Sequence, residues 1–147
     1  MNARDYLHQL EVVETRINSI QFDIQQLKEL AMSVTPAYEG DRVQSSGSLQ
    51  RTASAIERWV DRERELNAAI DKLVDLRLEI ADTIEHLKKP KESGVLHMLY
   101  IQKKSFKEVA VHYDKSVSWA TSVHGRALQS LQKELNSRTK QADCEKV

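Results

Sequence analysis

The sequence predicts an all-α fold in which a long coiled-coil helical hairpin is followed by a three-helix helix-turn-helix domain. Its 147 residues include only 4 Gly and 2 Pro, too few for the many tight turns of β-barrels and sandwiches. Apolar residues also recur at helical spacing in both halves of the chain. With 30% charged and 5% aromatic residues, we expect an elongated element beside one small core.

The first predicted helix extends from about residue 2 to residue 32. Its apolar residues are separated alternately by three and four positions, which is the heptad pattern of a coiled coil: Leu10, Val13, Ile17, Ile20, Ile24, Leu27 and Ala31. Residues 33–47 contain Pro36, two glycines and several serines, a composition typical of a flexible connector.

The second predicted helix covers residues 48–89 and ends before Pro90, because a residue that precedes proline is disfavoured in the α region. Its predicted seam is Ile56, Val60, Glu63, Leu66, Ile70, Leu73, Arg77, Ile80, Ile84 and Leu87. Residues 70–87 carry further apolar side chains off this seam, so the helix needs more than one neighbour. Self-association and docking of the third segment both satisfy it. For self-association, the predicted contact residues are Ile17, Ile20, Ile24, Leu27, Ile70, Leu73, Ile80 and Ile84.

Beyond Pro90 the apolar residues form three short runs, at residues 94–101, 105–113 and 116–135. Three short helices around a small core are typical of a helix-turn-helix. Ser105 and Glu108 have the spacing of a capping box, and Ser116 is the predicted N-cap of the third helix. The predicted domains are therefore a hairpin at 1–89, a helix-turn-helix at 90–136 and a disordered polar tail at 137–147.

Charge differs between these regions. Residues 1–90 hold 12 basic and 16 acidic residues, whereas residues 91–140 hold 9 basic and 4 acidic residues. A neutral total therefore conceals a basic carboxy-terminal domain, which favours contact with phosphates.

Other classes of protein are disfavoured. A single cysteine, Cys144, excludes an intramolecular disulfide and a cysteine-based zinc site, and no two histidines are spaced as metal ligands. Acidic and basic residues alternate along the second helix as on a solvated face. We therefore expect no enzyme activity, cofactor or metal. Without a signal-peptide core or a run of 18 apolar residues, we expect a cytoplasmic protein that does not enter membranes.

A family resemblance rests on residues 96–131. Tyr100, Ser105, Glu108-Val-Ala110, Ser116 and His124-Gly-Arg126-Ala-Leu128 resemble region 4 of sigma-70 family factors, the helix-turn-helix that reads the promoter −35 element. In its layout the whole chain resembles the small phage-encoded sigma-region-4-like proteins of Gram-positive prophages, related to ArpU-type late transcriptional regulators. Where these relatives have glycines, this chain has Lys103 and Asp114.

The resemblance implies a sequence-specific DNA-binding transcriptional regulator of phage late genes, with double-stranded DNA as its partner and RNA polymerase as a further one. The third helix becomes the recognition helix. The DNA-binding residues are then Lys103, Lys104, Lys107, Lys115, Ser116, Ser118, Trp119, Thr121, Ser122 and Arg126. For Trp119 we weigh DNA contact against packing on the amino-terminal helices, and favour packing. The alternative function is a protein-protein adaptor with a degenerate helix-turn-helix that does not bind DNA.

Overall fold

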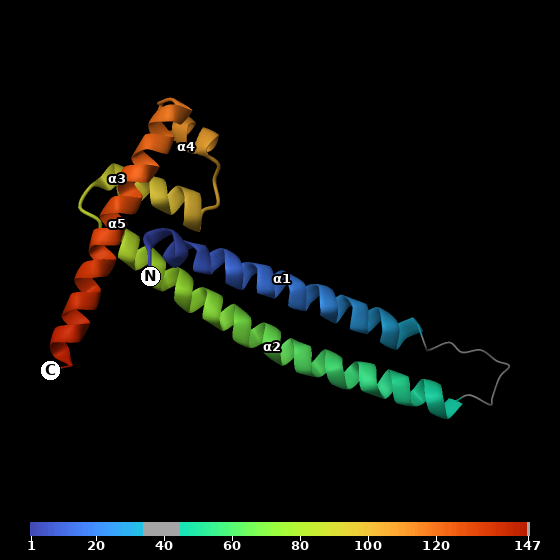
Figure 1. The fold of residues 1–147 in the computed structure, drawn as a ribbon. Coiled ribbons are helices and arrows are strands. Elements are labelled where there is room, and N and C mark those ends of the chain that lie inside the picture. The colour runs from blue at the N-terminus through green and yellow to red at the C-terminus, as the bar shows by residue number, and fades with distance from the viewer. Residues whose placement is uncertain (34–44, 147) are drawn as a thin grey trace. The chain divides into compact units, whose positions relative to one another are not determined.

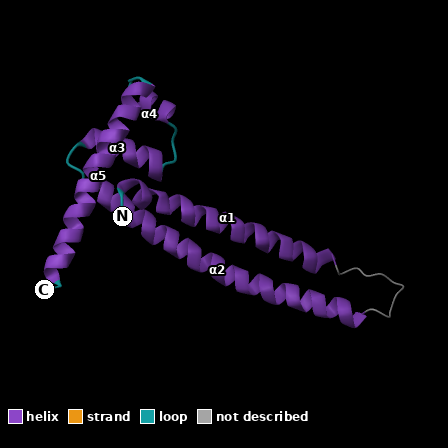
Figure 2. Cartoon of the chain, in the orientation of Figure 1, coloured by secondary structure: helices purple, strands orange, loops and turns teal. Residues whose placement is uncertain are grey.

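The computed structural model describes residues 1–33 and 45–146, and these residues form five α-helices, one short π-helix and no strand (Figure 2). The predicted all-α class is therefore confirmed. Within the described residues, no helix has the length and apolar character needed to cross a membrane.

The first two helices are α1, Ala3–Ser33, and α2, Ser45–Glu85. Of the predicted connector, residues 34–44 lie outside the described residues, and α2 begins three positions before the predicted start. At its other end α2 stops at Glu85 rather than at residue 89, and the Leu87 N–H donates to the Ile84 carbonyl at 3.1 Å in a tightened last turn. Pro90 does not terminate α2 but begins the next helix, where its missing N–H costs nothing.

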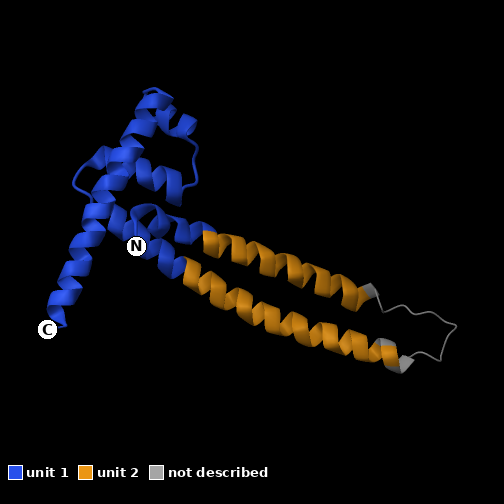
Figure 3. Cartoon of the chain, in the orientation of Figure 1, with its two compact units in different colours: residues 1–11, 74–147 blue, residues 12–73 orange. Residues whose placement is uncertain are grey.

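The chain divides into two compact units (Figure 3): residues 12–73, and residues 1–11 together with 74–147. The predicted boundary at residue 89 does not coincide with this division, because the ends of both hairpin helices belong to the same unit as the carboxy-terminal helices.

In the unit of residues 12–73, α1 and α2 lie side by side and run in opposite directions (Figure 1). Arg62 Nη2 lies 3.2 Å from Asp23 Oδ2, and Lys28 Nζ lies 5.0 Å from the centre of the Trp59 ring. The predicted seam of α1 is buried at Val13, Ile17, Ile20, Ile24 and Ala31. The heptad pattern of the first helix is thus confirmed as the contact face of an intramolecular hairpin.

The seam of α2 agrees only in part with the predicted one. The predicted seam is buried or half-buried at Leu66, Leu73, Ile80, Ile84 and Leu87, whereas in residues 45–73 four other positions of the seam lie one residue earlier. Among the described side chains of residues 45–73 the buried and half-buried positions are separated by three and four residues: Thr52, Ala55, Trp59, Arg62, Leu66, Ala69 and Leu73. Two alanines lie on this face. The polar ends of Trp59 and Arg62 have hydrogen-bond partners on the same helix, since Trp59 Nε1 donates to Glu63 Oε1 at 2.8 Å and Arg62 Nη1 donates to Glu65 Oε2 at 2.7 Å. The predicted seam residues Ile56, Val60, Glu63 and Ile70 are exposed instead.

The second unit contains four further elements: α3 at Pro90–Leu96, η2 at His97–Ile101, α4 at Phe106–His112 and α5 at Val117–Glu145. Their core is a cluster of small and medium apolar side chains, Val95, Met98, Val109, Ala110, Ala120 and Val123. The predicted capping box is present, because Ser105 Oγ accepts from the Glu108 N–H at 3.2 Å and Glu108 Oε2 accepts from the Ser105 N–H at 2.9 Å. Ser116 Oγ accepts from the Trp119 N–H at 3.1 Å, as predicted for an N-cap.

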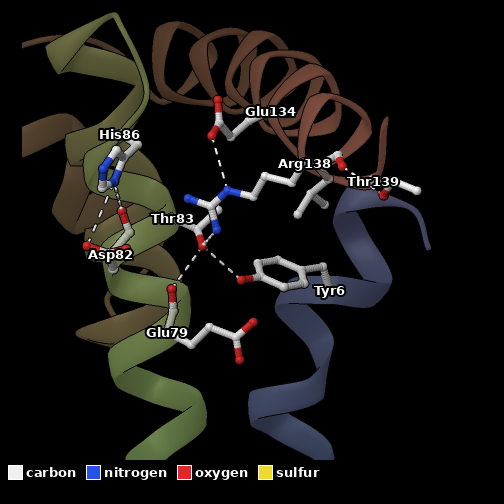
Figure 4. A network of polar contacts seen from close by, with 9 residues as sticks. Tyr6, Glu79, Asp82, Thr83, His86, Glu134, Arg138 and Thr139 are labelled. Atoms are coloured by element: carbon white, nitrogen blue, oxygen red, sulfur yellow. Dashed lines mark hydrogen bonds and ion pairs between the residues drawn. The ribbon is translucent and has the colours of Figure 1, made fainter. Parts of the chain in front are cut away.

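The prediction of a disordered tail from residue 137 is wrong, because α5 continues to Glu145. A polar network fixes this extension (Figure 4). Arg138 Nη1 donates to Thr83 Oγ1 at 2.8 Å, and the guanidinium also contacts Glu134 at 3.2 Å. Thr83 Oγ1 donates to the Glu79 carbonyl at 2.9 Å, so the Tyr6 hydroxyl, 3.0 Å away, donates to Thr83. Burial raises the pKa of Tyr6, which keeps this donor protonated.

Candidate nucleic-acid interface

Two left-handed residues set the connections between the short helices. Lys103 has φ 59° and Asp114 has φ 57°, and among the described non-glycine residues these two have positive φ. Before Lys103, the Gln102 N–H closes the π-helical turn on the His97 carbonyl at 3.0 Å. After Asp114, the Lys115 N–H donates to the Ala110 carbonyl at 2.8 Å. Left-handed backbone costs a non-glycine residue about 1–2 kcal/mol. The turns before α4 and before α5 therefore each contain one left-handed residue that is not glycine.

One face of α5 is exposed and made of small residues. Ala120, Val123, Ala127 and Leu131 are buried, as the helical spacing predicts. The predicted outward residues are all exposed: Ser118, Thr121, Ser122 and Gly125. A Cβ atom added to Gly125 would meet no heavy atom within 4 Å. This face offers hydroxyls and close backbone approach without a bulky side chain in the way.

Trp119 packs within its own domain. Its side chain is half-buried against the three-helix core, with its ring centroid 5.4 Å from that of Tyr113. Trp119 therefore packs on other side chains, as favoured above. The partner is different from the one expected, because Tyr113 belongs to the helix-turn-helix and not to the amino-terminal helices.

The predicted phosphate-contacting lysines are exposed around the start of α4 and α5. Lys104, Lys107 and Lys115 are exposed, and so is Lys103. Lys103 also borders a hollow of about 350 Å³ that α1 lines with Arg4, Asp5, Leu7, His8 and Glu11, and that Tyr100 and His124 complete. Ser116 is exposed, with its oxygen occupied as the N-cap of α5.

His124 is a residue to which the sequence assigned no role beyond the motif. Its Nε2 lies 2.8 Å from the Tyr100 hydroxyl, and its ring meets Phe106 edge to face with centroids 5.3 Å apart. Burial lowers the pKa of His124 below its ordinary value of 6.5, and the positive charge of Arg4 lowers it further. A neutral imidazole therefore joins α5 to the elements that precede it. Its aromatic partners lie 18 and 24 positions away, a separation that no local pattern reveals.

A second hollow, of about 490 Å³, lies between the start of α3 and the flank of α5. Its lining combines apolar and cationic side chains: Lys89, Pro90, Lys91, Glu92, Trp119, Val123 and Arg126. Glu92 is only 5% exposed, and its carboxylate accepts from Ser130 Oγ at 2.6 Å and lies 3.8 Å from Lys89 Nζ. Sequence reasoning placed Lys89 at the end of the hairpin and gave Lys91 no function, because the fold alone brings them beside α5.

The residues predicted for self-association divide into two groups. Ile17, Ile20, Ile24, Ile80 and Ile84 are buried within the single chain, so their assignment as a contact with a second copy is wrong. Leu27 and Leu73 are half-buried, and Ile70 is 38% exposed. In residues 45–73 the exposed large apolar side chains are Leu49, Ile56, Val60 and Ile70, which follow the stripe beside the buried seam of α2.

These features define an all-α protein in which two long helices precede a set of short helices and α5, with cationic side chains around an exposed polar face of α5. A family model described as a protein of unknown function (DUF1492) matches residues 32–136, and the chain belongs to this family. No curated protein and no solved structure matches the chain.

Proposed function

We propose that this protein is a sequence-specific double-stranded DNA-binding regulator of transcription. The observation that carries the proposal is the exposed face of α5, where Ser118, Thr121, Ser122 and Gly125 form a small polar surface at the start of a capped helix. An α-helix with such a face fits the major groove, where hydroxyl groups can donate to or accept from base edges. Lysines exposed on the neighbouring turns supply the contacts to phosphates that fix the position of a helix in the groove.

The proposal divides the predicted residues between contacts to phosphates and contacts to base edges. Lys104, Lys107 and Lys115 bind backbone phosphates, and Lys103 does so at the turn before α4. Ser118, Thr121 and Ser122 contact base edges. The Thr121 hydroxyl already donates to the Val117 carbonyl at 3.0 Å, so it meets DNA as an acceptor unless it rotates. Arg126, exposed on the flank, neutralises a phosphate or pairs with guanine.

The finer parts of the proposal rest on the family resemblance and on the exposed stripe of α2. The resemblance to sigma-70 region 4 and to ArpU-type regulators supports phage late genes as the target and RNA polymerase as a partner. The stripe of Leu49, Ile56, Val60 and Ile70 supports self-association of the hairpin, because one copy leaves these apolar side chains in water. This stripe replaces the buried isoleucines as the proposed contact between copies.

Salt dependence of DNA binding tests the proposal. Affinity for a duplex should fall with a log-log slope of about −0.9 for each phosphate neutralised. Lys104→Ala with Lys107→Ala should make the slope shallower by up to about 2 and leave sequence preference unchanged. Lys72→Ala with Lys146→Ala is the matched control, since both residues are exposed and lie outside the proposed interface.

The adaptor alternative predicts a different result. If the protein does not bind duplex DNA at low salt, or binds with no salt dependence, the proposal fails and the helix-turn-helix serves protein contacts. Footprinting on the genome that encodes the chain would then show no protected site. Ser118→Ala with Thr121→Ala separates the reading face from the phosphate contacts, because removing one good hydrogen bond to a base should reduce discrimination by about 1–3 kcal/mol.

A further inference from the structure

The hollow between the start of α3 and the flank of α5 is cationic at its rim and apolar at its floor. Pro90, Trp119 and Val123 supply the apolar surface, while Lys89, Lys91 and Arg126 supply three positive charges. Its volume of about 490 Å³ lies in the range of ordinary ligand clefts. A cationic rim around an apolar floor suits a partner whose anionic groups reach the rim while its C–H groups face the floor.

Carboxylates of the described residues neutralise only part of the positive charge at this hollow. Glu92 is the acidic residue in the lining, and its buried carboxylate is already bound by Ser130 Oγ. Lys89 is the cation that it approaches, at 3.8 Å. Within residues 1–33 and 45–146, neither Lys91 nor Arg126 forms an ion pair with a carboxylate. Two of the three cations therefore remain available to an anion from outside.

The hollow adjoins the exposed face of α5 along the flank that carries Trp119 and Arg126. At 100° per residue, Trp119, Arg126 and Ser130 share one flank of α5, and Ser130 contacts Glu92 of α3. His124 lies on the other flank, where it meets Tyr100 of η2 and Phe106 at the start of α4. The reading face of Ser118, Ser122 and Gly125 thus has one group of cations near the start of α4 and a second group at Lys89, Lys91 and Arg126.

We propose that this hollow binds the sugar–phosphate backbone of the DNA strand that borders the major groove along the Trp119 and Arg126 flank of α5. The inference rests on the proposed function and adds Lys91 to its binding residues. A helix in the major groove has a phosphate backbone on each side, and a duplex on the exposed face of α5 brings one of them to the flank that carries Arg126. Lys91 and Arg126 bind the phosphates, and the exposed part of Trp119 contacts the deoxyribose. The contact is sequence-independent, because every backbone offers the same groups.

An acidic protein segment is the competing occupant. It would satisfy the same cations and could place an apolar side chain on Pro90 and Val123. The backbone is favoured because the hollow directly borders the helix whose exposed face is small and polar, so a duplex on that face brings a strand to the rim. An acidic segment needs no such neighbour.

The decisive experiment compares the salt dependence of duplex binding in the full chain and in Lys89→Gln with Lys91→Gln. We expect the double variant to bind random-sequence and preferred duplexes more weakly by the same factor, with a log-log slope shallower by about 0.9, for the phosphate that Lys91 no longer neutralises. Lys88→Gln with Lys72→Gln removes equal charge outside the hollow and should leave the slope within error of the wild type. Circular dichroism checks that Lys89, the N-cap of α3, can be replaced without loss of helix.

A fluorescence measurement reports on the hollow directly. In a Trp59→Phe background Trp119 is the remaining indole, since the chain has 2 Trp. A random-sequence duplex should protect Trp119 from iodide quenching in this protein and should protect it less in the Lys89/Lys91 variant. If instead quenching is unchanged by duplex, the backbone does not occupy the hollow and the inference is overturned.

Failure of the inference and failure of the proposed function are distinguishable. Wild-type protein that binds duplex with the same slope as the double variant retains the proposed function and overturns this site. Wild-type protein that does not bind duplex overturns both. Polyglutamate serves as the acidic-segment probe: if the double variant loses polyglutamate binding but keeps the wild-type DNA slope, the hollow is a protein-binding site and the inference is wrong.

Discussion

Different sequence signals specify the hairpin of residues 12–73 and the carboxy-terminal helices. In the hairpin, heptad spacing specifies that helices form but leaves two adjacent stripes of α2 as rival contact faces, and the chain buries the one with two alanines. In the carboxy-terminal helices, short runs are bounded by caps, so Ser105 and Ser116 define the starts of α4 and α5 to the residue. Periodicity thus predicts the type of element, whereas capping predicts its position.

The largest expected effect separates the two stripes of the hairpin. Ile20→Asp places a charge at a position only 3% exposed, whereas Ile56→Asp places the same charge at a position 43% exposed. We expect Ile20→Asp to destabilise the fold by about 4 kcal/mol or more, enough to unfold a marginal hairpin. Ile56→Asp should change folding stability by less than about 0.5 kcal/mol.

Urea denaturation measures both variants, and light scattering measures their mass. If Ile56 contacts a second copy, Ile56→Asp should shift the wild-type oligomer toward the 16.9 kDa monomer without unfolding it. Equal loss of stability in the two variants would instead place Ile56 on the buried seam, contrary to the structure.

The next effect concerns a glycine whose absence of a side chain is required. Gly94 of α3 faces the Tyr113 hydroxyl, which a Cβ atom would strike. Because the Tyr113 ring also contacts Trp119, it has little room to withdraw. We expect Gly94→Ala to cost about 1–3 kcal/mol, as for other overpacked sites, despite the better helix propensity of alanine. Thermal unfolding of Gly94→Ala, with Gly94→Ala/Tyr113→Phe as the control that removes the clashing oxygen, tests this.

Gly125 should behave in the opposite way. A Cβ atom there meets open space, so Gly125→Ala should stabilise α5 by about 0.5–1 kcal/mol. If α5 lies in the major groove, the same methyl group should weaken duplex binding severalfold because it holds the helix away from the bases. A variant that is both more stable and unchanged in DNA affinity would show that Gly125 does not touch the duplex.

The smallest effect is a pH dependence that belongs to His124. Burial lowers the pKa of His124 below 6.5 in the folded chain, so the unfolded chain takes up a proton first as the pH falls. Stability should therefore be full above pH 6.5, fall as the pH drops through that value, and stop falling below the folded pKa. Thermal midpoints at pH 7.5 and 5.5 should differ less in His124→Gln than in the wild type. The exposed His112→Gln variant should keep the wild-type difference.

The parts of the fold that sequence predicts are those fixed by local chemistry. The first helix, both caps and the buried face of α5 follow from spacing and from side-chain oxygens, and the left-handed turns occur where the resembled family has glycine. The extension of α5 to Glu145 could not be predicted this way, since it depends on Arg138 reaching Thr83 across 55 positions of sequence.

In the candidate site, too, the features set by one helix can be predicted from sequence, whereas those set by contacts between distant segments cannot. Exposure of Ser118, Thr121 and Ser122 follows from the angle between residues on one helix. The hollow that joins Lys91 to Arg126 depends on how α3 meets α5, and Ser130 holding Glu92 is a contact between residues 38 positions apart. A single sequence contains no signal for such a pairing.

The contacts made by the first residues of α1 also constrain the order in which the chain matures. Tyr6 bonds Thr83, which in turn bonds Arg138, and the Ala3 N–H donates to Gln132 Oε1 at 2.7 Å. During synthesis these partners emerge long after α1 itself. The helices of the hairpin at residues 12–73 pack on each other, so the hairpin can form on the ribosome before the contact partners of residues 3–6 have been synthesised. The beginning of α1 is therefore among the last of the described segments to reach its native contacts, because those contacts need α5.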